Sequence, residues 1–373
     1  MKIATMVRAY LPVPRPVDMI YAPIDVAVTL TQGLTNRGHQ VTFFGPMGTN
    51  LSTPTETLNL RPLAHNREEF AALMGNPAQT SHNVPGLWDL YMVREMFERA
   101  RAGQYDLLHF HHPEVALPFA KLYPDVPVVY TVHDPLLPWW REAIEMYLSP
   151  NQYFISISDN QRLTAPDLPY IATIYDGIDT TQFSFPKDLV KDDYLLYAGR
   201  VVPEKGVKEA VQVAEQTGSR LLIIGPTYPD QQEYFDTFIR PHLNEKILYL
   251  GFMERDQLIK YFQKARALLL PAQWEEPFGM TMVEAMACGT PVIALRRGSI
   301  PEVIANGKSG FVVDSLSEMV SAVAKASDID PAECRLHVER HFSIGHMVNN
   351  YIAAFRDVLK ISEEPVKSKA KSA

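Results

Sequence analysis

The chain has 373 residues and a formal net charge of −8, with 46% hydrophobic and 21% charged residues. These proportions are ordinary for a globular protein and exclude a disordered or collagen-like chain, and the length predicts about two domains. The acidic total disfavours nucleic acid as a partner, because proteins that bind nucleic acid are more often basic. Two cysteines, Cys288 and Cys334, are too few for a cysteine-rich zinc site.

The chain offers no segment for a membrane span, since no run of 18 or more apolar residues occurs. The apolar run within residues 1–8 is too short for the core of a secretory signal and is typical of a first strand. We therefore expect a cytoplasmic protein. Any membrane contact is expected to be at most peripheral. The three lysines near the end of the chain offer a membrane-anchoring role as one alternative, but a solvated tail is favoured.

Short apolar runs rich in β-forming residues alternate with helical patterns along the chain. Continuous hydrophobicity is typical of strands that are buried on both faces. The predicted strands are 2–7, 40–44, 107–110, 128–132, 153–157, 171–174, 194–198, 221–224, 247–250, 267–270, 292–295 and 311–313. The predicted helices between them include 26–37, 208–217, 254–264 and 281–288, and residues 331–361 are also helical by pattern. This alternation predicts an α/β protein with parallel sheets covered by helices.

The strand and helix pattern occurs twice, which predicts two doubly wound, Rossmann-like domains. The join is expected near residues 183–193, where Pro186 and several charged residues interrupt the apolar periodicity. We place the N-terminal domain at 1–182, the C-terminal domain at 183–345, a last helix at 346–361 and a disordered tail at 362–373. Ligands of such sheets bind beyond the carboxyl ends of the strands, so a cleft where the two domains face each other is the predicted site.

The densest chemical signal follows the predicted strand 267–270. The sequence E-E-P-F-G-M over 275–280 precedes a predicted helix, with Glu276 in the loop and Glu284 in the first turns of the helix. The N–H groups of a helix start suit an anionic ligand, and two carboxylates beside it can accept hydrogen bonds from sugar hydroxyls. The alternative, two solvated surface charges, is disfavoured by this loop and helix context.

A second signal follows the predicted strand 194–198. The loop G-R-V-V-P-E-K-G over 199–206 carries Arg200 and Lys205. Arginine can clamp a phosphate with two hydrogen bonds, and lysine adds a compact charge. Such residues in a loop are usually just solvated, but the carboxyl end of a strand is where ligands are expected.

Histidines close two strands of the first half. His109, His111 and His112 end one strand, and His133 follows the next. A metal cluster is one alternative, although no H-E-x-x-H spacing occurs, and packing histidines are another. His133 is the best candidate to face the cleft. Nearby Trp139 and Trp140 are acceptor-side candidates, because aromatic rings stack on sugars or line lipid sites, with simple packing as the alternative.

Together these motifs resemble those of the retaining glycosyltransferases of family 4, which have the two-domain GT-B fold. Glu276 and Glu284 match the E-x7-E element of that family, and residues 199–206 match its G-R-x-x-x-E-K-G element. The D-G-I-D sequence at 176–179 resembles its interdomain turn, with Asp176 in place of asparagine. The pattern after Phe342 resembles its C-terminal helix, which crosses back to the first domain.

The resemblance implies sugar transfer from a nucleotide-diphosphate sugar, with a UDP-sugar favoured, to a hydroxyl acceptor of unknown type. The anomeric configuration would be retained by front-face substitution, and the acceptor's proton would pass to a donor phosphate oxygen. No metal or other cofactor is implied, because Arg200, Lys205 and the helix start can supply the positive field. The nucleotide sugar is then a substrate.

The resemblance also implies a role for each candidate residue. Arg200 and Lys205 would neutralise the diphosphate. Glu276 would hold hydroxyls of the donor sugar, and Glu284 those of the ribose. His133 would approach the transferring sugar. The remaining donor-binding candidates are backbone groups beside the sugar and phosphate and residues near the base, namely Phe278, Gly279, Met280, Gly251, Phe252 and Met253.

One segment departs from the family pattern. Family members carry a Gly-Gly loop before the first helix, whereas here residues 18–26 read D-M-I-Y-A-P-I-D-V, and the first glycine is Gly33. The stretch Tyr21-Ala22-Pro23-Ile24 leaves altered donor geometry, weakened catalysis or a rearranging loop open. The alternatives to a transferase are a non-catalytic nucleotide-sugar-binding protein and another GT-B chemistry, such as an epimerase or a phosphorylase, which the motif spacing disfavours.

Overall fold

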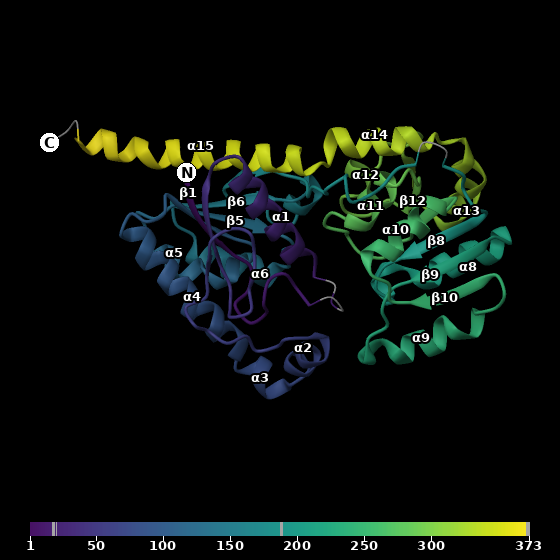
Figure 1. Ribbon diagram of the computed structural model, residues 1–373, viewed down its shortest axis with the longest axis horizontal. Helices are drawn as coiled ribbons and strands as arrows, with labels where there is room; N and C mark the ends of the chain where they lie inside the picture. The colour runs from purple at the N-terminus through teal and green to yellow at the C-terminus, as the bar shows by residue number, and fades with distance from the viewer. Residues whose placement is uncertain (17–18, 20, 187–188, 371–373) are drawn as a thin grey trace. The chain divides into compact units, whose positions relative to one another are not determined.

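The computed structural model describes residues 1–16, 19, 21–186 and 189–370, and the chain divides into two compact units (Figure 1). The N-terminal unit consists of Met1–Tyr175 together with the C-terminal segment Ile344–Ala373. The C-terminal unit is Asp176–Ser343.

The N-terminal unit is built on a parallel sheet with the order β3-β2-β1-β4-β5-β6-β7 in the described part of the chain. Its strands are β1 (Lys2–Met6), β2 (Gln40–Phe44), β3 (Thr55–Glu56), β4 (Leu107–Phe110), β5 (Val128–Val132), β6 (Gln152–Ser156) and β7 (Tyr170–Thr173). The two-residue strand β3 has no apolar run and was not predicted. Its helices are α1 (Ala22–Asn36), α2 (Arg67–Met74), α3 (Pro77–Ser81), α4 (Val84–Arg101), α5 (Leu117–Leu122), α6 (Pro138–Tyr147), α7 (Asp159–Arg162) and α15 (Ile344–Ala370).

Both faces of this sheet are buried, as the continuous apolar runs predict. In β5, Val128 and Tyr130 belong to a core with Phe97 of α4, whereas Val129 belongs to a core with Tyr351 of α15. Successive residues of a strand point to opposite faces, so one apolar run supplies two cores. Helix α15, in yellow in Figure 1, therefore completes the N-terminal unit although it is the last element of the chain.

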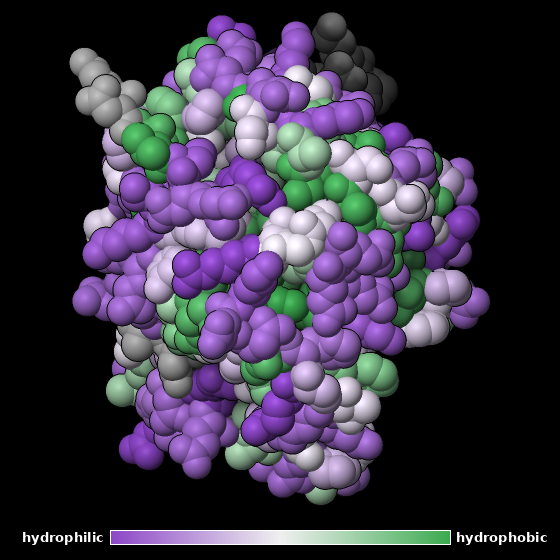
Figure 2. All heavy atoms as spheres, turned by 90° about the vertical axis from the view of Figure 1, so that its right-hand side faces the viewer, coloured by the Kyte–Doolittle hydropathy of each residue, from purple (hydrophilic) through white to green (hydrophobic). Residues whose placement is uncertain are grey.

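The C-terminal unit has the parallel order β10-β9-β8-β11-β12-β13 among its described residues. Its strands are β8 (Tyr194–Ala198), β9 (Arg220–Ile224), β10 (Ile247–Gly251), β11 (Ala267–Leu270), β12 (Val292–Leu295) and β13 (Gly310–Val313). Its helices are α8 (Val207–Thr217), α9 (Gln232–Phe238), α10 (Arg255–Lys264), α11 (Met280–Ala287), α12 (Ile300–Val303), α13 (Leu316–Lys325) and α14 (Pro331–His341). Hydrophilic side chains cover most of the face of the molecule seen in Figure 2, and apolar residues form small patches between them.

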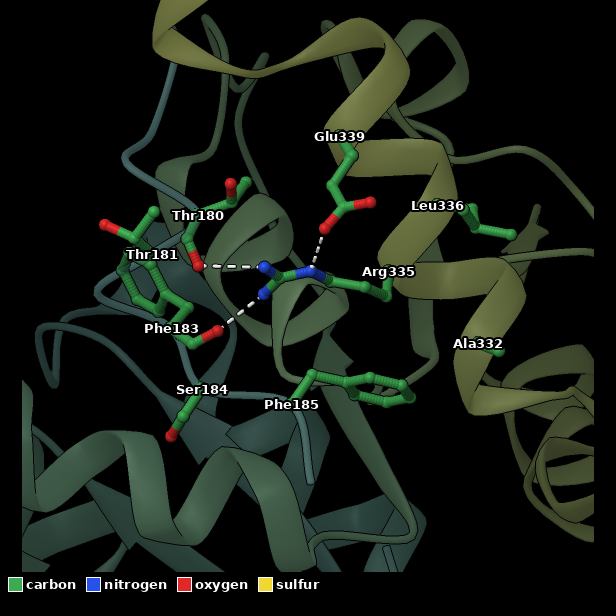
Figure 3. A pocket seen from close by; sticks show the side chains of 9 residues that line it. All are labelled: Thr180, Thr181, Phe183, Ser184, Phe185, Ala332, Arg335, Leu336 and Glu339. Carbon is green, nitrogen blue, oxygen red and sulfur yellow. Dashed lines mark hydrogen bonds and ion pairs between the residues drawn. The ribbon is translucent and has the colours of Figure 1, made fainter. Parts of the chain in front are cut away.

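The boundary between the units differs from the predicted one at 182/183. The structure places it after Tyr175, because the following segment is tied to α14 and not to the first sheet. Arg335 of α14 donates hydrogen bonds to the carbonyl oxygens of Thr180 and Phe183, as Figure 3 shows, and Ile178 N–H donates to Phe342 O at 2.9 Å. The segment and α14 line an open cavity of about 460 Å³. The interrupted apolar periodicity near Pro186 precedes β8 within the C-terminal unit. It does not mark the boundary between the two units.

The C-terminal region also differs from its prediction. The helical pattern over 331–361 is divided into α14 and α15 at Phe342 and Ser343, since the Phe342 carbonyl bonds Ile178 and the Phe342 ring packs on Phe278 at 5.8 Å. Helix α15 starts at Ile344 and extends to Ala370, whereas a disordered tail was expected from 362. Glutamate, lysine and alanine in this stretch are good helix formers and Pro365 is a poor one, so composition alone does not decide where the helix ends. Residues 371–373 of that tail lie outside the described part.

Candidate functional site

Two loops of the C-terminal unit meet beyond neighbouring strands, and one glycine permits the contact. Gly206 ends the loop after β8 with φ +74°, and a Cβ there would lie 1.8 Å from the carbonyl oxygen of Pro271 in the loop after β11. The Gln273 N–H donates to the Glu204 carbonyl at 2.8 Å and joins the same two loops. Only glycine combines this backbone conformation with so close an approach. The contact brings Lys205 and Glu276 together.

Lys205 and Glu276 form a partly buried ion pair. The Lys205 Nζ lies 3.0 Å from Oε1 and 2.7 Å from Oε2 of Glu276. The side chain of Glu276 is 8% exposed and that of Lys205 is 18% exposed. Glu276 is therefore no solvated surface charge, and its carboxylate is held within the site by a cation from another loop.

Trp274 contacts both members of this pair and was not predicted. Its indole N–H donates to Oε2 of Glu276 at 2.9 Å, and the Lys205 Nζ lies 4.4 Å from the centre of its ring. The sequence signal that could have indicated this role is an aromatic residue two positions before Glu276, in the loop that follows a predicted strand.

The turn after β12 fixes the loop that carries Glu276, and it too was not predicted. Ser299 N–H donates to Glu276 O at 2.8 Å, and the Ser299 hydroxyl donates to Phe278 O at 2.9 Å. Gly298 has φ +54°, and a Cβ there would lie 2.2 Å from Glu276 O. The sequence signal for this turn was the G-S pair at 298–299 after a predicted strand. Its bonding partners, Glu276 and Phe278, lie more than 20 residues earlier in the chain, so the sequence does not reveal them. This turn sets the backbone of Glu276 and Phe278 before any ligand binds.

Helix α11 begins beside the ion pair. Its N-cap is Gly279, which has no side chain to cap the helix, and the first N–H groups of a helix have no carbonyl partner within it. The Phe278 ring is buried in the core. Glu284 lies within α11 with 13% of its side chain exposed, 3.8 Å from Arg255 of α10. Backbone contacts of Phe278, Gly279 and Met280 with a ligand remain a prediction.

The other predicted donor residues follow strands of the same sheet. Arg200 is 37% exposed, and its guanidinium lies 3.6 Å from Glu204. Gly251 ends β10, where its carbonyl accepts a hydrogen bond from Gly225 N–H at 2.9 Å, and Phe252 and Met253 are half-buried in the next loop. The carboxyl ends of parallel strands lie at one edge of a sheet, so the loops after β8, β10 and β11 share that edge.

The predicted histidines cluster beyond β4 and β5 of the N-terminal unit. His111 Nδ1 and His133 Nε2 lie 2.9 Å apart, and His112 Nε2 lies 2.8 Å from the Tyr21 hydroxyl. His109 is bonded between Thr5 and Thr131 and is a packing histidine. Burial lowers the pKa of His109 and of His133 to about 3, and the pKa values of His111 and His112 fall well below the usual range for the same reason. The cluster is therefore neutral at physiological pH.

A cavity of about 60 Å³ lies against this cluster, lined by His111, His133, Asp134 and Trp140 among others. Trp140 packs against the core, whereas Trp139 is 64% exposed on the same helix, α6. Within the described ranges, no group of three or more His, Cys, Asp and Glu side chains is arranged to hold a metal ion. No helix of the described chain is long and apolar enough to cross a membrane.

The segment before α1 is only partly described, since residues 17, 18 and 20 lie outside the described residues. Tyr21 precedes α1, and Pro23 takes one of its first positions, as the sequence predicts for a helix start. Arg8, just after β1, pairs with Asp89 at 3.1 Å and with Glu114. Burial raises the pKa of Asp89 to about 6. Sequence reasoning missed this network, because its members come from three separate elements.

The chain matches two models of known families and several curated and solved proteins. "Glycosyltransferase Family 4" matches residues 25–182, and "Glycosyl transferases group 1" matches residues 179–332. The glycogen synthase of Mycobacterium tuberculosis is 28% identical over 352 residues, with 81% of each chain covered.

Solved structures show the same fold. AviGT4, a glycosyltransferase of avilamycin A biosynthesis, is 22% identical with a TM-score of 0.68, covering 96% of this chain and 98% of its own. Anabaena HepE in complex with UDP and glucose is 16% identical with a TM-score of 0.70, covering 95% and 99%. The two models together span residues 25–332, and with the two parallel sheets described above these matches show a glycosyltransferase with the GT-B fold.

Proposed function

We propose that the protein transfers a sugar from a nucleoside diphosphate sugar to a hydroxyl acceptor with retention of configuration. The observation that carries the proposal is the Lys205–Glu276 pair beside the start of α11, at the carboxyl ends of β8 and β11. A diphosphate needs cations and N–H donors, and a sugar needs hydrogen-bond acceptors for its hydroxyls. Both kinds of group converge at this point.

Each donor-binding residue has a role that its surroundings support. Lys205 and Arg200 neutralise the leaving diphosphate together with the N–H groups of Gly279 and Met280. Glu276 accepts hydrogen bonds from the donor sugar. In the same proposal Glu284 of α11 holds the ribose, and the loop over 251–253 contacts the base.

UDP is the favoured nucleotide. The support comes from HepE, which has this fold and was solved in complex with UDP-glucose. We propose no metal, because the two cations and the helix start supply the positive charge that the leaving group requires.

The proposed reaction proceeds on one face of the sugar. The acceptor oxygen forms a bond to the anomeric carbon as the bond from that carbon to the diphosphate breaks, and the acceptor proton passes to a phosphate oxygen. His133 contributes a hydrogen bond to the transferred sugar and no proton, because burial holds its pKa near 3, so the imidazole is neutral at physiological pH. No side chain forms a covalent bond to the sugar.

The experiment is an incubation of the full chain with UDP-glucose and a panel of hydroxyl acceptors, with new glycosides and their anomeric configuration read by NMR. A glycoside that retains the α-configuration of the donor supports the proposal, and an inverted product contradicts the mechanism.

A non-catalytic binding protein is the second candidate. It is favoured by Tyr21, which contacts His112 where family members have a glycine loop. Binding of UDP-glucose without any transfer to the panel or to water would support this second candidate.

A further inference from the structure

We infer that Trp274 is a positioning residue for Glu276, and that it sets how tightly the sugar half of the donor is held. The inference rests on the proposed function, in which Glu276 receives the donor sugar. It concerns a residue that neither the sequence motifs nor the family matches single out.

One aromatic ring contacts both charges of the Lys205–Glu276 pair. The N–H at the edge of the Trp274 indole points to the Glu276 carboxylate at 2.9 Å, and the ring lies 4.4 Å from the Lys205 ammonium. An aromatic ring carries positive charge at its edge and negative charge on its face, so one residue is attractive to both partners. No aliphatic side chain can replace it in both contacts.

The contacts also define which part of the carboxylate is left for a ligand. Oε2 of Glu276 accepts from both Trp274 and Lys205, whereas Oε1 accepts from Lys205 alone among the residues that the structure describes. A carboxylate has about four acceptor positions in total, so the remaining ones lie mostly on Oε1. The structure therefore assigns Oε1 to the sugar hydroxyl and Oε2 to the protein.

Donor binding changes the partners of Lys205 but not those of Trp274. A diphosphate attracts the Lys205 ammonium and weakens its hold on the carboxylate. The indole N–H carries no net charge, so the diphosphate does not attract it away from Oε2. Trp274 then keeps Glu276 in the orientation that receives the sugar at the moment when the lysine is shared. The backbone of Glu276 is fixed independently by Ser299.

The test compares Trp274→Phe with the wild type in the full chain, using calorimetric titration with UDP and with UDP-glucose. Phenylalanine keeps a ring face for Lys205 and lacks the N–H. The matched control is Trp88→Phe, since the Trp88 indole also donates at 2.7 Å but to the Arg61 carbonyl in the N-terminal unit. We expect Trp274→Phe to weaken UDP-glucose binding about tenfold, as loss of a hydrogen bond to a charged group does. The affinity for UDP is expected to stay within about twofold, because UDP lacks the sugar.

An equal loss for both probes in Trp274→Phe, or no loss for either, overturns the inference, and the control variant excludes a general effect of losing an indole. If the wild type binds neither probe, the proposed donor fails, and a measurement without ligand still decides the positioning contact. The indole N–H resonance of Trp274 in the Glu276→Gln variant is expected to move upfield from its wild-type position. An unmoved resonance overturns the inference whatever the ligand.

Discussion

The two units place different chemistry at the same edge of similar sheets. In the C-terminal unit the loops carry charges, and each cation of the site has a carboxylate beside it; the pairs are Arg200–Glu204, Lys205–Glu276 and Arg255–Glu284. In the N-terminal unit the loops after β4 and β5 carry His111, His112 and His133, which burial keeps neutral. The same architecture therefore carries exchangeable ion pairs at this edge in one unit and buried, uncharged histidines in the other.

The sharpest contrast between the units is their response to acid. The pKa values of His109 and His133 are lowered to about 3 in the fold, whereas unfolded histidine titrates near 6.5. Between these values the unfolded state binds more protons, so stability is present above pH 6.5 and is lost as the pH falls. From pH 6.5 to pH 5, these two histidines together lower the unfolding free energy by about 3 kcal/mol.

Hydrogen exchange at pH 7 and pH 5, resolved by segment, checks this prediction. The N-terminal unit should lose protection first, and His109→Gln should remove about half of the loss. The exposed His65 of the same unit provides the control variant, His65→Gln, which should change nothing. If the C-terminal unit lost protection first at pH 5, the prediction would be contradicted.

One added carbon atom at Gly206 is enough to disrupt the contact between the loops after β8 and β11. Gly206→Ala places a Cβ against the Pro271 carbonyl oxygen, so the backbone must shift, and we expect a loss of about 3 kcal/mol in the stability of the C-terminal unit. Gly218→Ala is the control, because Gly218 also has a positive φ of 64° and a Cβ added there would have nothing within 4 Å. That change should cost only about 1 kcal/mol of backbone strain. Thermal unfolding of the two variants measures the difference, and equal costs would mean that the loops do not need this contact.

Asp176, at the start of the C-terminal unit, responds to pH with the opposite sign from the histidines. It is buried with one carboxylate oxygen unpaired within the described chain, and burial raises its pKa from 3.8 to about 7. The folded state then binds more protons than the unfolded state between these values, so stability falls as pH rises toward 7. Asp176→Asn should raise the unfolding free energy by about 4 kcal/mol at pH 8 and by little at pH 4. Denaturant titrations at the two pH values test this, and a pH-independent gain would contradict it.

The charge of Lys205 should matter for the donor more than any surface lysine does. Lys205→Ala is expected to weaken UDP binding by at least about 1.5 kcal/mol, because a charge-assisted bond to the diphosphate is lost. Lys325, which is exposed in the last turn of α13, supplies the control variant Lys325→Ala. Equal effects in a calorimetric titration would mean that the diphosphate site lies elsewhere.

Much of the fold could be predicted because each buried parallel strand appears in the sequence as a short, continuous apolar run. The runs at 107–110 and 128–132 match β4 and β5 residue for residue. The unit boundary could not be predicted, since it depends on Ile178 bonding Phe342 and on Arg335 reaching Thr180, more than 150 residues away in each case. The division of the last two helices has the same origin.

The candidate site shows a similar division. Lys205 and Glu276 stand out because each belongs to a dense local motif, although no spacing indicates that the two side chains form an ion pair. Trp274 and Ser299 have no such motif, and their roles exist only through contacts made in the folded chain. The sequence shows that Asp176 stands where the family has asparagine. It does not show that one oxygen of this carboxylate is buried and unpaired within the described chain.

Hydrogen exchange of the full chain with and without UDP-glucose reports where the donor binds. We expect slower exchange in the loops over 199–206 and 271–280, where Gly206 brings Lys205 to Glu276, and no change in α9. Unchanged exchange in both loops, or protection confined to other segments, would contradict a donor site built on the Lys205–Glu276 pair.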